Sequence, residues 1–363
     1  MKLSLEPVRA RLRAPFAAAW GTISERELFV VRLEADDGTL GWGEAAPLAG
    51  YGYATGEQIW AALESYRGAL TGSGDRSRDQ VLAACAAASN LPEALASVDL
   101  ALWDLEGRRT GQPLWQMLVS QGAWDITRSS SGQYPNLRPH PPGVPVNATV
   151  AAEDPAMVAE QVRATREAGF RCVKIKVALG DDSARLAAAR SAGGMDMAIR
   201  VDANGAWSVE QAAAKLEALA AYEIEICEEP VHGLDEIGRV AAASRIPIAL
   251  DETAAAPGAF EHRVCDAACL KIARSGGLTR LLEQAARARA AGYRIYLAST
   301  LDGPLAIAAA LHAAVAIRPE LPCGLSTLGM FADRADPMPA RDGRISAPVG
   351  PGLGEGLREW YGL

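Results

Sequence analysis

Several features that mark other classes of protein are missing from this chain of 363 residues. No stretch reaches the roughly 18 uncharged apolar residues of a membrane-spanning helix, and no apolar segment of signal-peptide length follows Met1. Runs rich in lysine and arginine are also absent, and the net charge is −8, so a surface for nucleic acid or an anionic membrane is not expected. We therefore expect a cytoplasmic protein that acts on a small molecule.

Cysteine and histidine are scarce as well. The six cysteines form no CxxC pair and most lie in apolar runs, which predicts buried free thiols in a reducing compartment. The four histidines (His140, His232, His262 and His312) have no metal-ligand spacing, so a histidine-based zinc site is not expected. The chain does have 49% apolar and 22% charged residues, which is typical of a globular protein with a large core.

The pattern of apolar residues divides the chain into parts. Residues 1–120 combine strands, including a hairpin with its turn at 36–38, with helices, and predict an α+β domain. Residues 121–143 are rich in Ser, Pro and Gly and predict a linker or insert. From 144 to 326, short apolar segments alternate with alanine-rich helical segments at eight βα-type pitches, which predicts either a closed barrel or a doubly wound open sheet. The expected strands are 144–150, 171–177, 197–202, 224–228, 247–251, 267–273, 293–299 and 322–326.

Three consecutive strands of this series end in acidic residues. Asp202 ends one strand, Glu228 and Glu229 end the next, and Asp251 and Glu252 end the third. Because the carboxyl ends of parallel strands lie on one face of a barrel, these carboxylates should converge there. Converging carboxylates repel one another unless they share a cation, and oxygen ligands suit Mg²⁺. We predict a Mg²⁺ site, with Mn²⁺ as the alternative ion, on Asp202, Glu228 and Asp251. Glu229 and Glu252 are expected beside it, with Glu252 paired to a lysine.

Lysines flank these acids on both sides. Lys174 and Lys176 share one face of the second strand, and Lys271 follows the acids on the sixth. A closed barrel lets the second and sixth strands face each other across the metal, whereas an open sheet separates them, so the barrel is favoured.

A lysine near a divalent cation and a second ammonium should have a lowered pKa and can act as a base. This predicts removal of the α-proton of a carboxylate substrate, with Lys176 and Lys271 as catalytic residues and Lys174 as a neighbour that lowers the pKa of Lys176. Two interpretations of Arg200 stay open: it orients Lys176, or it forms an ion pair inside the barrel. Asn204, close to Asp202 in sequence, is expected near the substrate.

In combination these motifs resemble the enolase superfamily, and specifically its muconate lactonizing enzyme subgroup. The segments that carry the resemblance are KIK, VDANGAW, CEEP, LDE, LKIARSGG and, nearer the N-terminus, VDLALWDLEGR. The resemblance implies a (β/α)₇β TIM-type barrel at 144–326, with an N-terminal α+β capping domain at 1–120 that is completed by the C-terminal tail, 327–363. It also implies mobile lid loops at 16–22 and 47–53, and a homo-oligomer.

Residues on the last two strands bear on the substrate. The seventh carries Ser299 and Thr300 where the mandelate racemase branch has a histidine. The eighth carries Ser326 and Thr327 where dipeptide epimerases hold a substrate ammonium with Asp-x-Asp, and hydroxyls suit a carboxylate or carbonyl better. The chain thus looks most like the o-succinylbenzoate synthases, dehydratases of menaquinone biosynthesis.

Other reactions of the same subgroup stay open. They are N-succinylamino acid racemisation, dipeptide epimerisation and muconate-type cycloisomerisation. A non-catalytic binding barrel is disfavoured, because the acids and both lysines are all present.

Overall fold

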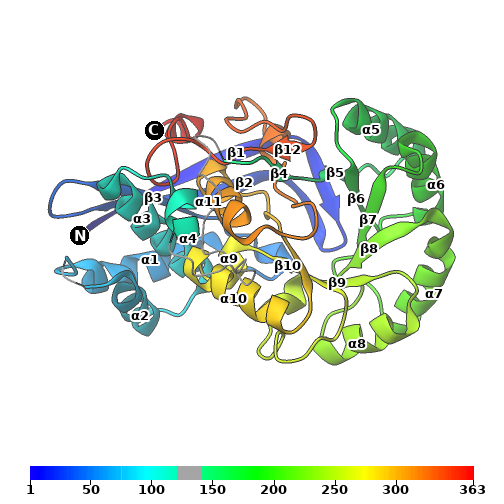
Figure 1. The fold of residues 1–363 in the computed structure, drawn as a ribbon, viewed down its shortest axis with the longest axis horizontal. Helices are drawn as coiled ribbons and strands as arrows, with labels where there is room; N and C mark the ends of the chain where they lie inside the picture. The colour runs from blue at the N-terminus through cyan, green and yellow to red at the C-terminus, as the bar shows by residue number, and fades with distance from the viewer. Residues whose placement is uncertain (75, 121–140) are drawn as a thin grey trace, which may run out of the picture.

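An antiparallel sheet and three helices form the N-terminal part of the computed structural model, which describes residues 1–363 except 75 and 121–140. The sheet has the order β1-β2-β3, with β1 (Lys2–Ala18), β2 (Gly21–Glu34) and β3 (Leu40–Ala45). The helices are α1 (Gly56–Leu70), α2 (Arg78–Ala88) and α3 (Pro92–Thr110), followed by the short α4 (Leu114–Ser120) (Figure 1). The expected hairpin is confirmed, since β2 and β3 pair around a turn in which Gly38 has φ +81°.

Two glycines of β3 let α3 lie directly on the sheet. A Cβ on Gly41 would lie 2.1 Å from the Ala101 carbonyl oxygen, and one on Gly43 would lie 1.9 Å from that of Ser97. The helix backbone therefore approaches the strand more closely than any larger residue permits. This close approach buries α3 along most of its length and builds the core of the cap.

The second sheet is parallel and has seven strands in the order β11-β10-β9-β8-β7-β6-β5. Its strands are β5 (Ala148–Val150), β6 (Cys172–Lys176), β7 (Ala198–Asp202), β8 (Ile224–Glu228), β9 (Ile248–Leu250), β10 (Ala267–Leu270) and β11 (Arg294–Leu297). The helices that accompany them are α5 (Pro155–Glu167), α6 (Asp182–Gly193), α7 (Val209–Leu219), α8 (Leu234–Ala243), α9 (Ile272–Ser275), α10 (Leu278–Ala290) and α11 (Pro304–Ile317). Seven of the eight expected strands are therefore found where the apolar segments predicted them.

The eighth expected strand, 322–326, is reduced to two single-residue bridges. Gly324 bridges Ala298, directly after β11, and Cys323 bridges Val146, which lies between β4 and β5. These bridges join the two edges of the seven-stranded sheet and close it. The closed barrel confirms the predicted fold and excludes the doubly wound open sheet.

One connection between strands differs from the expected helix. Between β9 and β10 the chain forms only a 3-10 helix, η3 (Glu252–Ala255), followed by turns. Pro257 and Gly258 follow it after Ala256, and this pair disfavours a longer helix. Residues 121–140 of the predicted insert lie outside the described residues.

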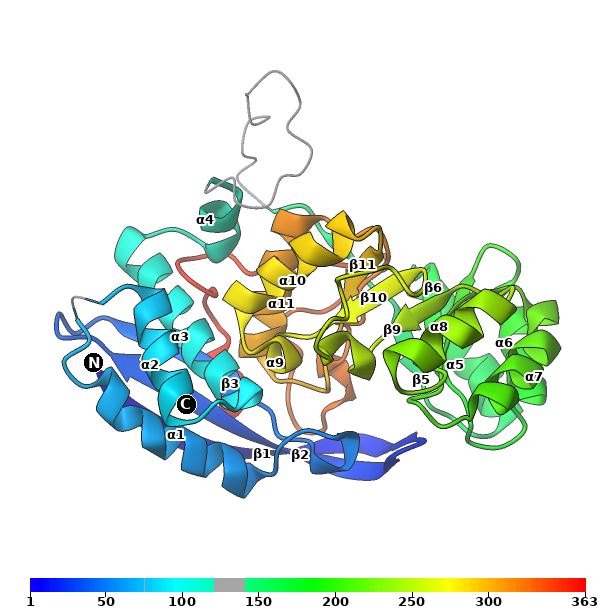
Figure 2. The same cartoon turned by 90° about the horizontal axis from the view of Figure 1, so that it is seen from below.

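The C-terminal tail joins the barrel to the cap. Its strand β12 (Arg344–Ile345) pairs with β4 (Val144–Pro145), and its last element, η5 (Arg358–Tyr361), reaches β3, where the Tyr361 hydroxyl donates to Glu44 (Figure 1). Figure 2 shows the far ends of β1 and β2 extending past the cap helices toward the barrel. The domain boundaries themselves stay a prediction.

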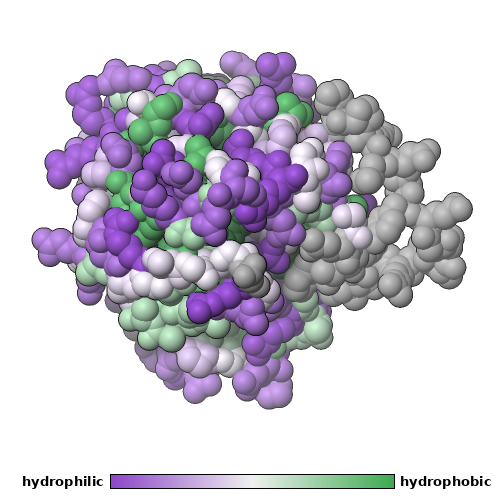
Figure 3. Space-filling view, turned by 90° about the vertical axis from the view of Figure 1, so that its left-hand side faces the viewer, coloured by the Kyte–Doolittle hydropathy of each residue, from purple (hydrophilic) through white to green (hydrophobic). Residues whose placement is uncertain are grey.

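The outer surface on the cap side is mixed in character. Figure 3 shows hydrophilic side chains over most of this face, with apolar ones in small separate patches among them. None of the helices in the described parts of the chain is long and apolar enough to cross a membrane.

His312 on α11 is fully buried and joins three segments of the chain. Its Nδ1 accepts a hydrogen bond from the Trp115 amide of α4 at 3.2 Å, and its Nε2 lies 3.1 Å from the Leu353 carbonyl oxygen of the tail. Burial lowers the pKa of His312 from 6.5 to about 4, so the folded protein holds the ring neutral.

The pKa of His312 predicts a loss of stability in acid. Between pH 6.5 and 4 the unfolded chain binds a proton at this position and the folded chain does not, so the free energy of unfolding falls as the pH drops. We expect His312 to lower the free energy of unfolding by about 1.5 kcal/mol between pH 6.5 and 5. Urea unfolding at both pH values should show a smaller pH dependence in His312→Gln than in the wild type. His262→Gln, at an exposed position, is the control, and an equal pH dependence in His312→Gln and the wild type would contradict the prediction.

Candidate active site

The register of three neighbouring strands places three charged residues of the site side by side. Parallel pairing places Lys176 beside Asp202, and Asp202 beside Glu228, and each is the last residue of its strand. Asp251 and Lys271 directly follow β9 and β10. All five side chains therefore start from the carboxyl edge of the barrel, where active sites of this architecture lie.

The two lysines of β6 point into the barrel mouth and contact the acids. Lys174 Nζ lies 2.8 Å from Asp202 and 2.6 Å from Glu228. Lys176 Nζ lies 2.6 Å from Asp202 and donates to the Asn204 side-chain oxygen at 2.8 Å. The chain has only five lysines among 36 basic residues, and three of them meet at this edge. Lysine, unlike arginine, can lose its proton in a protein.

A residue of the cap, Tyr51, also contacts the charged residues of the site. Tyr51, in η1 (Ala49–Tyr51), donates its hydroxyl to Asp251 at 2.6 Å and accepts from Lys271 Nζ at 2.9 Å. Lys271 Nζ also lies 2.6 Å from Asp251. Arg274 donates to the Tyr51 carbonyl oxygen at 2.9 Å. The second predicted lid loop is thus held against the barrel by these contacts.

Buried charges set the electrostatics of the site. Burial raises the pKa of Glu228 to about 7; Lys174 opposes this shift, and Asp202 and Asp251 add to it. Burial acts to lower the pKa of Lys174, but Asp202 and Glu228 outweigh it, so this pKa is raised, and Asp251 likewise raises the pKa of Lys271 against the effect of burial. The carboxylates around Lys174 and Lys271 therefore act opposite to the lowering of a lysine pKa that a divalent cation would cause.

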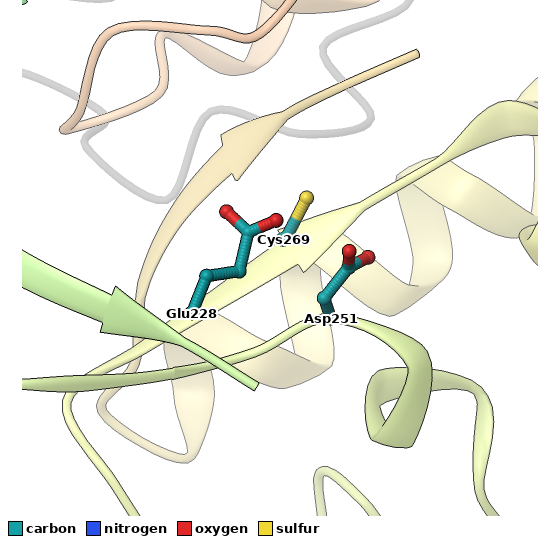
Figure 4. Close-up of side chains that lie close together, drawn as sticks. All are labelled: Glu228, Asp251 and Cys269. Atoms are coloured by element: carbon teal, nitrogen blue, oxygen red, sulfur yellow. The ribbon is translucent and has the colours of Figure 1, made fainter. Parts of the chain in front are cut away.

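The donor set fits a divalent cation. Asp202, Glu228 and Asp251 are 1%, 0% and 4% exposed, and oxygen atoms of Glu228 and Asp251 lie within 4.8 Å of each other (Figure 4). The ammonium of Lys174 bridges Asp202 and Glu228, so the position already attracts positive charge. Carboxylate oxygens are the ligands that Mg²⁺ prefers.

The residues beside the acids position them. Glu229 accepts hydrogen bonds from the amides of Asp251 and Thr253 at 2.7 and 3.0 Å, and so holds the segment that carries Asp251. Asn204 donates to Glu252 at 3.2 Å. Within the described residues no lysine pairs with Glu252, contrary to expectation, because the lysines are paired with the other acids.

Arg200 lies in the barrel interior and binds Glu225. Its Nε is 2.6 Å from Glu225, and its guanidinium lies 5.0 Å from the centre of the Tyr296 ring. Tyr296 in turn donates its hydroxyl to Glu228. Of the two interpretations left open by the sequence, the structure supports the ion pair, and no direct contact between Arg200 and Lys176 is found among the described residues.

A pocket with about 550 Å³ of empty space, part of it open to solvent, lies over the lysines. Three of the four expected hydroxyl residues, Ser299, Thr300 and Thr327, line it, whereas Ser326 does not. The other lining residues are Phe16, Trp20, Leu48, Tyr51, Thr149, Lys174, Lys176, Lys271, Ala298, Leu301, Gly324 and Met330. None of these lining residues, all in the described part of the chain, is acidic.

Comparison with known families agrees with this geometry. Residues 157–360 match the family model described as enolase C-terminal domain-like. Residues 2–119 match that of the mandelate racemase/muconate lactonizing enzyme N-terminal domain. The chain belongs to the enolase superfamily. It is a member of the muconate lactonizing enzyme subgroup, which confirms the resemblance seen in the motifs.

Individual members of the superfamily differ in their identity to this chain and in how much of it they cover. The hydrophobic dipeptide epimerase of Enterococcus faecalis is 30% identical over 332 residues, 87% of this chain and 88% of the epimerase. The o-succinylbenzoate synthase of Mycobacterium ulcerans is 38% identical over 216 residues, 56% of this chain and 63% of the synthase. The crystal structure of a dipeptide epimerase from Cytophaga hutchinsonii, complexed with Mg and D-Ala-L-Val, matches with a TM-score of 0.84 and 25% identity over 99% of this chain and 98% of that one.

Three residues near the acids of this enolase-superfamily member were not anticipated from its sequence. They are Tyr51, Tyr296 and Cys269. Strand alternation places Cys269 on the same side as Lys271, so this signal could have found it. Tyr51 has no such signal, because its place depends on how the cap lies against the barrel.

Proposed function

We propose that this chain is a Mg²⁺-dependent lyase that removes the α-proton of a small carboxylate substrate and eliminates water, as o-succinylbenzoate synthases do. The observation that carries the proposal is the pocket lining, which combines three lysines with hydroxyls and, among the described residues, contains no acid. Such a surface attracts an anionic substrate and offers no partner for a substrate ammonium. The 38% identity to an o-succinylbenzoate synthase supports the same choice.

The proposed roles follow from the contacts of the site. Asp202, Glu228 and Asp251 would hold Mg²⁺, which when bound supplies positive charge against the negative charge that develops on the substrate carboxylate. Lys176, in the pocket wall, takes the α-proton, and the ammonium of Lys271 stabilises the carbanion.

Elimination then returns the same proton. As the double bond forms, the bond to the β-hydroxyl breaks, and Lys176 protonates the departing hydroxide, which leaves as water. Tyr51 donates to Asp251 and accepts from Lys271, and thereby holds Lys271 in place.

Substrate comparison tests the proposal. With Mg²⁺ present, we expect kcat/KM for the cyclohexadiene carboxylate of o-succinylbenzoate synthases to exceed that for a hydrophobic dipeptide by at least about 100-fold, because the pocket leaves a dipeptide ammonium without a partner. Turnover followed by ultraviolet absorbance and by polarimetry measures both reactions. Activity on dipeptides alone would contradict the proposal.

Racemisation of N-succinyl amino acids is the second candidate. It is favoured by Lys176 and Lys271 lining one pocket, since racemisation needs a base on each face of the substrate, and succinylation removes the ammonium. Exchange of the α-proton in D₂O from both enantiomers, without turnover of the cyclohexadiene, would select this reaction over dehydration.

A further inference from the structure

Cys269 lies beside two of the proposed metal ligands. Alternate residues of a strand share a face, so Cys269 of β10 points to the same side as Lys271, which reaches Asp251. One carboxylate oxygen of Glu228, one of Asp251 and the Cys269 Sγ all lie within 4.8 Å of one another. Figure 4 shows the three side chains converging from neighbouring positions of the barrel. A sulfur atom is therefore available at the acidic cluster.

The thiol of Cys269 has no other partner in the described chain. It is 1% exposed and forms no disulfide. Four other buried thiols lie near hydrogen-bond acceptors; they belong to Cys172, Cys227, Cys265 and Cys323. Within the described residues no acceptor is found for Cys269. A small cavity, lined by Cys269, Asp251 and Lys271 among other residues, also lies beside this cluster.

We propose that Glu228, Asp251 and Cys269 form a binding site for a thiophilic divalent cation, namely Zn²⁺ or Cd²⁺. Sulfur is a soft ligand that these ions prefer, whereas Mg²⁺ takes oxygen ligands and gains nothing from it. The site shares two carboxylates with the proposed Mg²⁺ site and rests on that part of the proposed function. Binding of the two kinds of ion is therefore mutually exclusive, and Zn²⁺ or Cd²⁺ inhibits the enzyme.

Binding exchanges a proton for the metal. A cysteine thiol ordinarily carries its proton at neutral pH. As the metal–sulfur bond forms, the S–H bond breaks and the proton passes to the solvent, with no change of oxidation state. Lys174 and Lys271 pair with the same carboxylates, so the incoming cation displaces ammonium contacts.

Cadmium is the probe for this site, because a cadmium–thiolate bond gives an ultraviolet charge-transfer band that oxygen ligands do not give. The full-length protein, freed of other metals, is titrated with Cd²⁺ as the wild type, as Cys269→Ser and as Cys227→Ser. Cys227 is the matched control, since it is 0% exposed and directly precedes Glu228 but lies outside the cluster. Inhibition of Mg²⁺-dependent turnover by Cd²⁺ is followed in parallel.

The expected result is one band per chain in the wild type and in Cys227→Ser, and its loss in Cys269→Ser. Cys269→Ser removes a direct ligand and should weaken Cd²⁺ binding by at least about tenfold. Loss of a residue that only hydrogen-bonds to a metal ligand already lowers metal affinity by about that factor. A wild type without the band, a band that persists in Cys269→Ser, or one that disappears in folded Cys227→Ser overturns the inference. If Cys269→Ser does not fold, X-ray absorption of the wild-type cadmium protein decides: a sulfur neighbour supports the site, and an oxygen-only environment overturns it.

These outcomes separate the cysteine site from the proposed reaction. Turnover with Mg²⁺ in a protein that shows no cadmium–sulfur band overturns the cysteine site alone. A band that depends on Cys269, in a protein that turns over none of the tested carboxylates, supports the cysteine site and contradicts the reaction.

Discussion

Lys176→Ala is expected to lower kcat by about 10²- to 10⁴-fold, the range contributed by a positioned acid or base. Lys176 lines the pocket and contacts Asp202, and its removal takes away the group that we propose as the acceptor of the α-proton. Mg²⁺ binding should persist, because all three carboxylates remain and Lys174 still contacts Asp202 and Glu228. Steady-state turnover and α-proton exchange in D₂O measure the first effect, and calorimetric titration with Mg²⁺ measures the second.

Lys215→Ala is the matched control for this experiment. Lys215 lies exposed on α7, and its removal should leave both turnover and Mg²⁺ binding unchanged. If Lys176→Ala turned over substrate at nearly the wild-type rate, Lys176 would not be the base. If Lys176→Ala also failed to bind Mg²⁺, loss of the metal would explain its inactivity, and the experiment would not assign Lys176 as the base.

Glu228→Gln is expected to weaken Mg²⁺ binding by at least about 100-fold and therefore to abolish turnover. Mutation of a residue that only supports a metal ligand already lowers metal affinity by up to about 100-fold. The substitution keeps the size of the side chain and removes its charge. Glu228 lies between Asp202 and Asp251 in the order of the strands, so its loss divides the donor set. Calorimetric titration measures the affinity.

An exposed glutamate provides the comparison for Glu228→Gln. Glu217→Gln, on the outer side of α7, should bind Mg²⁺ as the wild type does. Thermal unfolding followed by circular dichroism establishes that both variants are folded. An unchanged Mg²⁺ affinity in folded Glu228→Gln would remove this residue from the metal site.

Much of the barrel could be predicted because its information is local. A buried parallel strand needs a short apolar run, and each βα unit returns the chain to the same edge, so regular spacing alone placed the acids and lysines together. The register of β6, β7 and β8 then matched the spacing of Lys176, Asp202 and Glu228. The barrel was therefore predicted correctly from one-dimensional spacing.

The structure departs from the predictions where contacts between distant segments determine how the chain pairs. Segment 322–326, expected as a strand, pairs with each of its neighbours at a single residue only and therefore forms two bridges. The lysine partner expected for Glu252 is replaced by Asn204, and the lysines pair with the three acids that the barrel brings nearest to them. Local sequence patterns contain no information about such choices between partners.

The sequence by itself determined the barrel, the N-terminal α+β domain and the order of the charged residues along the carboxyl edge, because strand alternation and βα spacing are properties of neighbouring residues. That this domain caps the barrel was implied by the family resemblance. Only the tertiary structure decided that Tyr51 of the cap contacts Asp251. Strand alternation predicts the side on which Cys269 lies, but only the tertiary structure decided that its sulfur is within reach of two carboxylates. Those contacts depend on how the cap lies against the barrel and on the relative positions of strand ends, which the separation of residues along the chain does not specify.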